Sequence, residues 1–374
     1  MKNLQEIEKS SCRNKVDKRC KRQRTIEMRA LCAVALCLTM LCACGVQPGD
    51  SRQETVEQPA VSNIYDLPLF DNLPKDYSNV DPAFWVAESQ NGGKVYLLGS
   101  IHAADETAYR LPKHIMDAYL ESDALAVEFD MISYESDEIA QKADKERTTY
   151  PDGDTLRNHI DPLIYAQLEE YISNNADDPQ LLSSLENRTP FIWLSVLSDI
   201  EDAAAGLSSE FGIDEHFLQL AHAQEKEIIE IESTASQYDA VNRVPDKAYE
   251  FLLSSSVFLT EEDTAGEALK ATYDAWKSGT IQGSGEIDDD EVAGEDPSGY
   301  AAAIAEYDRI LVKERNVVMA DAAKSFLDDG KKVFLVVGAD HLLGSDGVIA
   351  LLEADGYHIS QLGGTEGLQK YKDN

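Results

Sequence analysis

The chain has 374 residues and a formal net charge of −36 at neutral pH. Its hydrophobic content of 43% and its 16 tyrosines are typical of a folded globular protein. Such an acidic balance excludes binding of nucleic acid or anionic lipid through the general field of the protein. All six cysteines lie at or before residue 44, so the rest of the chain has no disulfide and no cysteine-based metal site.

The first 44 residues have the pattern of a targeting segment. Ten basic and four acidic residues give them a net charge of +6, which leaves −42 on residues 45–374. A basic stretch up to Arg29 is followed by an apolar run, Ala30–Leu41, that is too short to span a bilayer comfortably. Leu41-Cys-Ala-Cys44 then resembles a bacterial lipobox, in which the last cysteine is lipidated. We therefore expect a lipid anchor on Cys44.

The location of the body follows from this segment. Met28 is an alternative start that gives a more ordinary signal length, and an uncleaved helical anchor is the alternative to lipidation. Both alternatives leave the body outside the cytoplasmic membrane. Residues 45–78 are polar and rich in Gln, Asp and Pro, which is typical of a flexible tether. We expect an extracytoplasmic protein with one membrane-anchored globular domain over residues 79–374.

A β-hairpin is predicted where the body begins. Phe84–Ser89 and Lys94–Leu98 are β-favouring runs on either side of Gln90-Asn-Gly-Gly93, which is a strong turn signal. The second run continues through Leu-Leu-Gly-Ser-Ile to His102. A strand that ends in glycine can turn sharply and direct an imidazole from its end.

A strand–helix–strand unit follows this hairpin. Leu111-Pro112 opens a predicted amphipathic helix, and Ala124–Phe129 is the next predicted strand. If its strands are parallel, His102 and Glu128 emerge together at the carboxyl edge of the sheet, where α/β proteins place ligands.

The middle of the chain is predicted to be mainly helical. Residues 131–150 are polar and predict a mobile loop. Asp214 is a plausible helix N-cap. Apolar spacing predicts helices over residues 161–173, 190–205, 214–224, 246–259 and 261–277, with a strand over 226–231 that ends at Glu232.

The last third of the chain repeats the first motif. Residues 283–297 form an acidic run whose spacing is not that of an EF-hand loop, so we predict an exposed loop rather than a calcium site. A long helical stretch over residues 300–327 leads to Lys332-Val-Phe-Leu-Val-Val-Gly-Ala-Asp-His341, the second strand followed by G-x-x-H. A helix over 348–354 and a strand over 357–362 complete the predicted fold.

The candidate chemistry rests on His102, Glu128 and His341, with Ser100 and Asp340 beside the histidines. The chain contains no G-x-S-x-G, H-E-x-x-H, G-x-G-x-x-G or P-loop motif. Two imidazoles and a carboxylate can hold a divalent cation with open positions for water and substrate. The same set without metal can act as general base and acid, so the spacing leaves both possibilities open.

Each of these residues also has a structural interpretation. A single histidine after a strand usually makes a structural hydrogen bond, and only the repetition of the motif favours function. Glu128 can instead cap the following helix or pair with Arg315.

These features resemble the TraB/GumN family, which is related to the Tiki proteases and more distantly to erythromycin esterases and haem-binding ChaN lipoproteins. The resemblance covers about residues 84–362. It rests on Phe84-Trp, the segment ending in Gly-Ser-Ile-His102, Leu111-Pro112, Glu128, Gly212-Ile-Asp214, Lys226 with Glu232, Arg315-Asn316, Gly338-Ala-Asp-His341-Leu and Gly356-Tyr.

The resemblance implies an α/β fold in which a central mixed sheet is surrounded by helices and two halves each contribute a strand–GxxH motif. It implies a peptidase-like site with His102, Glu128 and His341 as catalytic residues and metal ligands, with manganese or cobalt favoured over zinc. Arg315 matches a family arginine, and we expect it to hold a substrate carboxylate or the glutamate itself. Ser100 and Asp340 are the other expected substrate-binding residues.

The function that these features predict is a lipid-anchored metal-dependent hydrolase acting on peptides or secreted proteins. The alternative is a non-catalytic surface protein that sequesters a peptide or haem in the same cleft. A third possibility is a metal-free esterase that uses histidine and glutamate, whose activity would survive chelation.

Overall fold

The computed structural model describes residues 80–364, apart from residues 177, 179, 262–264 and 282–298. The expected signal segment, the tether, the lipidated Cys44 and the acidic loop over 283–297 lie outside the described residues. None of the described helices is both long enough and apolar enough to cross a membrane.

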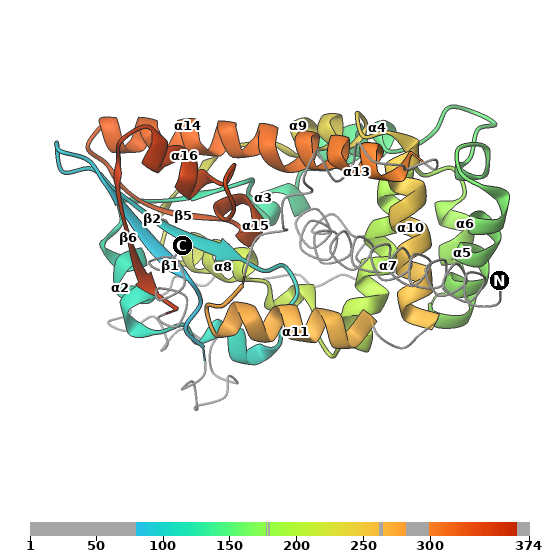
Figure 1. Cartoon of the computed structure of the whole chain (residues 1–374), viewed down its shortest axis with the longest axis horizontal. Helices are drawn as coiled ribbons and strands as arrows, with labels where there is room; N and C mark the ends of the chain where they lie inside the picture. The colour runs from blue at the N-terminus through green and yellow to red at the C-terminus, as the bar shows by residue number, and fades with distance from the viewer. Residues whose placement is uncertain (1–79, 177, 179, 262–264, 282–298, 365–374) are drawn as a thin grey trace, which may run out of the picture.

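The described residues form one six-stranded mixed sheet, as the sequence predicts (Figure 1). The hairpin of Gln90-Asn-Gly-Gly93 joins its first two strands, which pair antiparallel from Phe84 opposite Leu98 to Glu88 opposite Lys94. The order is β4-β3-β5-β2-β1-β6. The strands are β1 (Phe84–Glu88), β2 (Lys94–Ser100), β3 (Ala124–Val127), β4 (Glu227–Glu230), β5 (Lys332–Gly338) and β6 (His358–Gly363).

Parallel pairing brings the two G-x-x-H units together. Strand β5 lies between β2 and β3 and is parallel to both. In this register Ser100 lies opposite Gly338, so the chain leaves β2 and β5 at the same edge of the sheet. Val127 at the end of β3 lies opposite Val336, which brings Glu128 to that edge as well. The carboxyl edge is therefore where the predicted site residues emerge.

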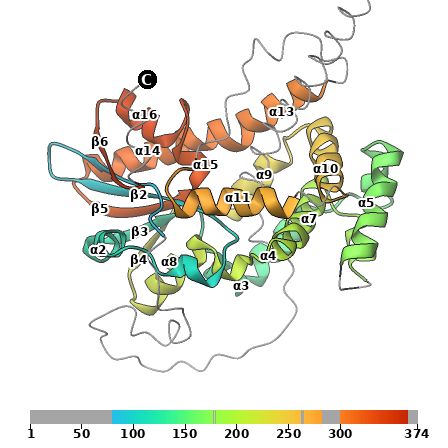
Figure 2. The same ribbon diagram turned by 60° about the horizontal axis from the view of Figure 1, so that its bottom comes forward.

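Helices cover both faces of the sheet because the strands alternate their side chains between two cores (Figure 1, Figure 2). Tyr96 and Leu98 face one core, and Val95 and Leu97 face the other. The first core contains α2 (Lys113–Glu121), α8 (Ile213–Ala223) and α11 (Ala265–Lys277), and the second contains α14 (Glu314–Asp328) and α16 (Val348–Ala354).

A third core lies among helices beyond the sheet, at the right of Figure 1. Its centre contains the buried side chains of Trp193 and Leu252. The helices that build it are α5 (Pro162–Asn175), α6 (Leu181–Leu185), α7 (Pro190–Ala204), α9 (Thr234–Val241), α10 (Asp246–Glu261) and α13 (Tyr300–Asp308).

The expected loop over residues 131–150 is wrong, because it contains α3 (Met131–Glu135) and α4 (Glu138–Arg147). Only Asp144 of α4 is buried, so this helix has no apolar stripe that periodicity could reveal. The sequence feature that indicates this helix is its N-cap residue. Asp137 accepts hydrogen bonds from the backbone N–H groups of Ile139 and Ala140.

The predicted helix over residues 300–327 contains a π-helical segment, η7 (Arg309–Lys313), between α13 and α14. Such segments are rare and occur frequently at functional sites. Here the segment directly precedes Arg315, and the carbonyl of Leu311 accepts a hydrogen bond from Nη1 of Arg315 at 3.2 Å. The shortest remaining elements are η4 (Glu106–Tyr109), η5 (Leu156–Asn158), η6 (Ser209–Phe211) and α15 (Ala339–Leu342).

Candidate functional site

His102 and His341 are both buried at the carboxyl edge of the sheet. His102 follows β2 and is 9% exposed, while His341 lies in α15 and is fully buried. Nδ1 of His102 lies 2.6 Å from Oδ2 of Asp214. Nδ1 of His341 lies 2.6 Å from Oδ1 of Asn316. Both rings are therefore held through Nδ1, and Nε2 is the nitrogen of each ring that would bind a cation or exchange a proton.

Asp214 does not cap its helix, contrary to the sequence-based expectation. Gly212 occupies the N-cap of α8, and Asp214 lies in the first turn with its carboxylate against His102. The backbone of Ile213 donates to the carbonyl of Ile101, which fixes the helix start beside the His102 loop. Burial would raise the pKa of Asp214, but the charge of His102 and polar contacts with His102 and Ser100 outweigh it and lower that pKa.

Glu128 is buried and accepts hydrogen bonds on both carboxylate oxygens. Oε1 accepts from the backbone N–H of Gly338 at 2.9 Å, and Oε2 accepts from Nη2 of Arg315 at 2.6 Å. Gln237 on α9 donates to the same Oε2 at 3.1 Å. Burial and the nearby charge of Glu232 raise the pKa of Glu128, whereas Arg315 opposes the rise. Of the two structural interpretations of Glu128, the pairing with Arg315 is the one observed.

Arg315 joins two glutamates, Glu128, which is buried, and Glu232, which is partly buried. Its Nη2 lies 2.7 Å from Oε2 of Glu232, and its Nε lies 2.9 Å from Oε1 of that residue. Glu232 stands beside Glu128 because its N–H donates to the carbonyl of Glu128, which extends the β3–β4 ladder. Nε, Nη1 and Nη2 of Arg315 are all directed at protein oxygens. This geometry matches the expectation that the arginine holds the glutamate; binding of a substrate carboxylate stays a prediction.

His341 faces Glu128 across the edge of the sheet. Nε2 of His341 is buried, makes no hydrogen bond within the described part of the chain, and lies 4.0 Å from Oε1 of Glu128. Burial lowers the pKa of His341 well below its ordinary value, and the charges of Arg315 and His102 lower it further. The charge of His102 also lowers the pKa of Glu128. The three predicted residues therefore share one electrostatic environment.

The fit of a metal ion is partial. The two Nε2 atoms and the Glu128 carboxylate have the donor chemistry of a divalent site, and the buried Nε2 of His341 is an unused ligand atom. The contacts at both Nδ1 atoms are those that metal-bound histidines usually make. Among the described residues, however, no three His, Cys, Asp or Glu side chains already stand close enough to hold a metal ion.

Ser100 and Asp340 are buried next to the two histidines, with exposed fractions of 3% and 2%. Ser100 contributes to the low pKa of Asp214. Burial raises the pKa of Asp308 in α13, and the charge of Asp340 raises it further. Neither side chain is solvent-accessible in this structure, so their expected contact with substrate stays a prediction.

Besides Asp214 and Glu232, three residues of the site were not predicted from the sequence as members of it. Asn316 and Gln237 contact His341 and Glu128, and both lie on helices far away in the chain. Asp202 lies near the end of α7, where burial raises its pKa to about 7, the charges of two neighbouring acids add to the rise, and His102 opposes it. Only Asn316, next to Arg315 in a family motif, carried a signal that could have identified it.

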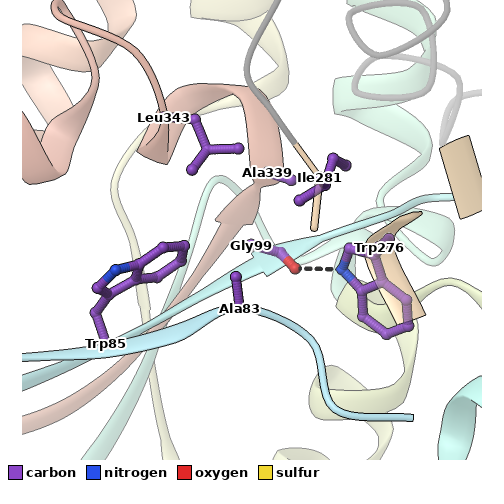
Figure 3. A pocket seen from close by; sticks show the side chains of 7 residues that line it. All are labelled: Ala83, Trp85, Gly99, Trp276, Ile281, Ala339 and Leu343. Atoms are coloured by element: carbon purple, nitrogen blue, oxygen red, sulfur yellow. Dashed lines mark hydrogen bonds between the residues drawn. The ribbon is translucent and has the colours of Figure 1, made fainter. Parts of the chain in front are cut away.

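A small apolar pocket lies next to Gly99 and Ala339 of the two G-x-x-H motifs, between β1, β2, the end of α11 and α15 (Figure 3). Nε1 of Trp276 donates to the carbonyl of Gly99 at 2.8 Å across it. A Cβ on Gly99 would lie 2.8 Å from Cα of Ala339, so glycine permits the close approach of the two motif backbones. The lining residues are Ala83, Trp85, Gly99, Trp276, Ile281, Ala339 and Leu343.

The mixed sheet with two strand–GxxH units and a buried His–Glu–His edge defines an α/β protein of the kind that the sequence resembles. A model of the TraB/PrgY/gumN family matches residues 83–361, and the chain belongs to this family.

Two relatives are similar to the chain over more than two thirds of its length. The chain is 26% identical to the uncharacterized protein YbaP of Escherichia coli (strain K12) over 259 residues, which is 69% of this chain and 87% of that protein. The YbaP protein of Shigella flexneri matches with the same identity and coverage. No solved structure matches the chain.

Proposed function

We propose that the protein is a lipid-anchored extracytoplasmic hydrolase that cleaves peptides with the help of a divalent cation, manganese or cobalt rather than zinc. The observation that supports a cation most directly is the buried Nε2 of His341, which makes no hydrogen bond within the described part of the chain. It lies 4.0 Å from Oε1 of Glu128, so an imidazole nitrogen and a carboxylate oxygen face each other without a hydrogen bond between them. Both atoms are of the kind that bind divalent cations.

The protein's own residues would act as follows. Arg315 and Gly338 fix the Glu128 carboxylate from two directions, so that its position does not depend on a ligand. Asp214 and Asn316 hold His102 and His341 through Nδ1, which directs both Nε2 atoms to the reacting groups. A cation bound by His102, Glu128 and His341 would supply an activated water and polarise the scissile carbonyl.

The proposed substrate class is peptides or secreted proteins. The family to which the chain belongs resembles the Tiki proteases, and the acidic body, with a net charge of −42 beyond residue 44, attracts basic peptides. An anchored enzyme outside the cell meets such substrates without transport.

The test uses the full chain in detergent, incubated with a diverse peptide mixture and analysed by mass spectrometry. Manganese, cobalt, zinc or a chelator is added in parallel. The variants are His102→Ala and His341→Ala, and the matched control is His159→Ala, a partly exposed histidine that lies between Asp154 and Asp246. We expect cleavage that needs manganese or cobalt, is lost in both site variants and persists in the control.

Other outcomes overturn parts of the proposal. If neither the wild type nor the variants cleave any peptide with any of the metals, hydrolysis is ruled out and binding of a peptide or haem becomes the proposed function. Cleavage that persists in both site variants would place the activity elsewhere.

A metal-free hydrolase is the second candidate, and the contact between His102 and Asp214 favours it. A histidine held by a buried carboxylate is the arrangement of a general base in many hydrolases. In this case cleavage survives chelation and is lost in Asp214→Asn. The chelator arm of the same experiment therefore separates the two candidates.

The anchor has its own test. A clickable fatty acid supplied to cells that express the full chain should label the protein and bring it into the detergent phase on partitioning. Cys44→Ala should abolish both effects, while Cys42→Ala is the matched control and should keep them. Labelling that persists in Cys44→Ala would overturn the lipid anchor at that residue.

A further inference from the structure

The two histidines of the G-x-x-H units differ in the groups that hold them. Nδ1 of His102 faces a carboxylate, Oδ2 of Asp214, at 2.6 Å. Nδ1 of His341 faces a carboxamide oxygen, Oδ1 of Asn316, at 2.6 Å. A carboxylate stabilises an imidazolium, whereas a carboxamide oxygen accepts a hydrogen bond without adding charge. Sequence motifs that look alike therefore present two chemically different rings.

The orientation of the Asn316 side chain follows from its second contact. Its Nδ2 donates to the backbone carbonyl of Asp346 at 2.9 Å. Turning the amide over would place its oxygen against that carbonyl oxygen, so that two acceptors would face each other. The oxygen of Asn316 consequently faces His341, and an acceptor at this position requires a proton on Nδ1.

The rest of the His341 ring is also determined by its surroundings. The side chain is fully buried, and Oε1 of Glu128, the carboxylate oxygen that faces Nε2, lies 4.0 Å away, beyond hydrogen-bonding distance. A proton on Nε2 would be a buried donor with no acceptor in the described part of the chain, which is costly. With the ring proton on Nδ1, Nε2 carries a lone pair.

We propose that Asn316 is a positioning residue that fixes His341 as the Nδ1-protonated tautomer and so presents the Nε2 lone pair toward Glu128. The use of this lone pair for a cation or a proton rests on the proposed function, whereas the tautomer is a property of the fold. The loop after His341 supports the arrangement, because Asp346 binds Asn316 through its carbonyl and Nζ of Lys313 through its carboxylate at 3.3 Å.

Nuclear magnetic resonance of the full chain with isotope-labelled histidine tests the proposal. Long-range proton–nitrogen spectra distinguish protonated from unprotonated ring nitrogens, and the His341→Gln variant assigns the signals of His341. We expect Nδ1 to be protonated and Nε2 unprotonated in the wild type near neutral pH. Asn316→Leu removes the acceptor and should increase the Nε2-protonated form, while Asn316→Asp keeps an acceptor and should retain the proton on Nδ1.

The matched control is Asn242→Leu, which removes an exposed asparagine whose Nδ2 donates to the carbonyl of Arg147 and should leave the spectrum of His341 unchanged. A wild-type His341 protonated on Nε2 alone would overturn the proposal even if Asn316→Leu failed to fold. An unchanged tautomer in a folded Asn316→Leu would do the same.

Manganese titration of the same samples separates this proposal from the function on which it draws. Loss of the hydrogen bond at Nδ1 should weaken manganese binding about 10–100-fold in Asn316→Leu but not in Asn242→Leu. If the wild type has the expected tautomer but binds no manganese and cleaves nothing, the positioning role of Asn316 stands and the proposed function fails.

Discussion

Nη2 of Arg315 lies 2.6 Å from Oε2 of Glu128, and both side chains are buried at the carboxyl edge of the sheet. This pair is a charge-assisted hydrogen bond in a buried position, where water could not take the place of either partner. Because Arg315 also binds Glu232, the guanidinium holds two strand ends together at the point where the candidate chemistry lies.

Loss of the guanidinium should destabilise the fold. We expect Arg315→Met to lower the free energy of unfolding by about 3–5 kcal/mol, because it leaves the buried carboxylate of Glu128 and the partly buried one of Glu232 without a cation. Urea denaturation measures the change. Arg243→Met removes an arginine from the half-exposed pair with Glu314 and is the control, with little expected effect. Equal stability of the two variants would show that the buried pair adds nothing.

The carboxylate behind His102 should matter for rate more than for stability. If His102 is the general base of the metal-free candidate, Asp214→Asn should lower kcat about 10²–10⁴-fold with a small change in Tm, because the amide keeps the shape but no longer stabilises a protonated ring. Asp154→Asn alters a comparable histidine–aspartate pair outside the site, with His159, and should leave kcat unchanged. Equal rates in the two variants would contradict the role of Asp214.

His216 should make the protein less stable in acid. Burial lowers the pKa of this core histidine to about 3, from an ordinary value of 6.5. Below pH 6.5 the unfolded chain takes up a proton that the folded chain refuses, so stability is lost as the pH falls and the loss is complete near pH 3. The slope from this group approaches about 1.4 kcal/mol per pH unit. His216→Leu should flatten the acid limb of the stability curve relative to the wild type, and parallel limbs would contradict the assignment.

The close approach of the two motifs should not tolerate a methyl group. A Cβ on Gly99 would meet Cα and Cβ of Ala339 at 2.8 and 2.9 Å, so Gly99→Ala should cost about 1–3 kcal/mol. Ala339→Gly in addition should recover only part of the loss, because the backbone at position 339 would still lie too close. Gly266→Ala, in a helix with its nearest neighbouring atom at 3.6 Å, is the control and should be neutral or slightly stabilising. Denaturation midpoints that rank the variants otherwise would refute this explanation.

Sequence patterns were enough to predict the α/β class, the hairpin around Asn91, most helices and the three candidate residues His102, Glu128 and His341. These follow from local rules, since alternating apolar strands, turn residues and the repeated G-x-x-H pattern can be recognised within short windows. Helix α4 was not predicted because only one of its residues is buried, so its sequence pattern resembles that of a polar loop.

The surroundings of those three residues could not be predicted without the folded structure. The register of β5 between β2 and β3 brings His102, Glu128 and His341 to one edge. The tertiary structure also places Asp214, an expected helix cap, against His102, and Asn316 against His341. The two partners of each contact lie far apart in the chain, by 112 positions (214 − 102) for His102 and Asp214 and by 25 positions for His341 and Asn316. Local sequence preferences fix the direction of a chain segment, whereas the charge and protonation of a buried side chain depend on neighbours that only folding supplies.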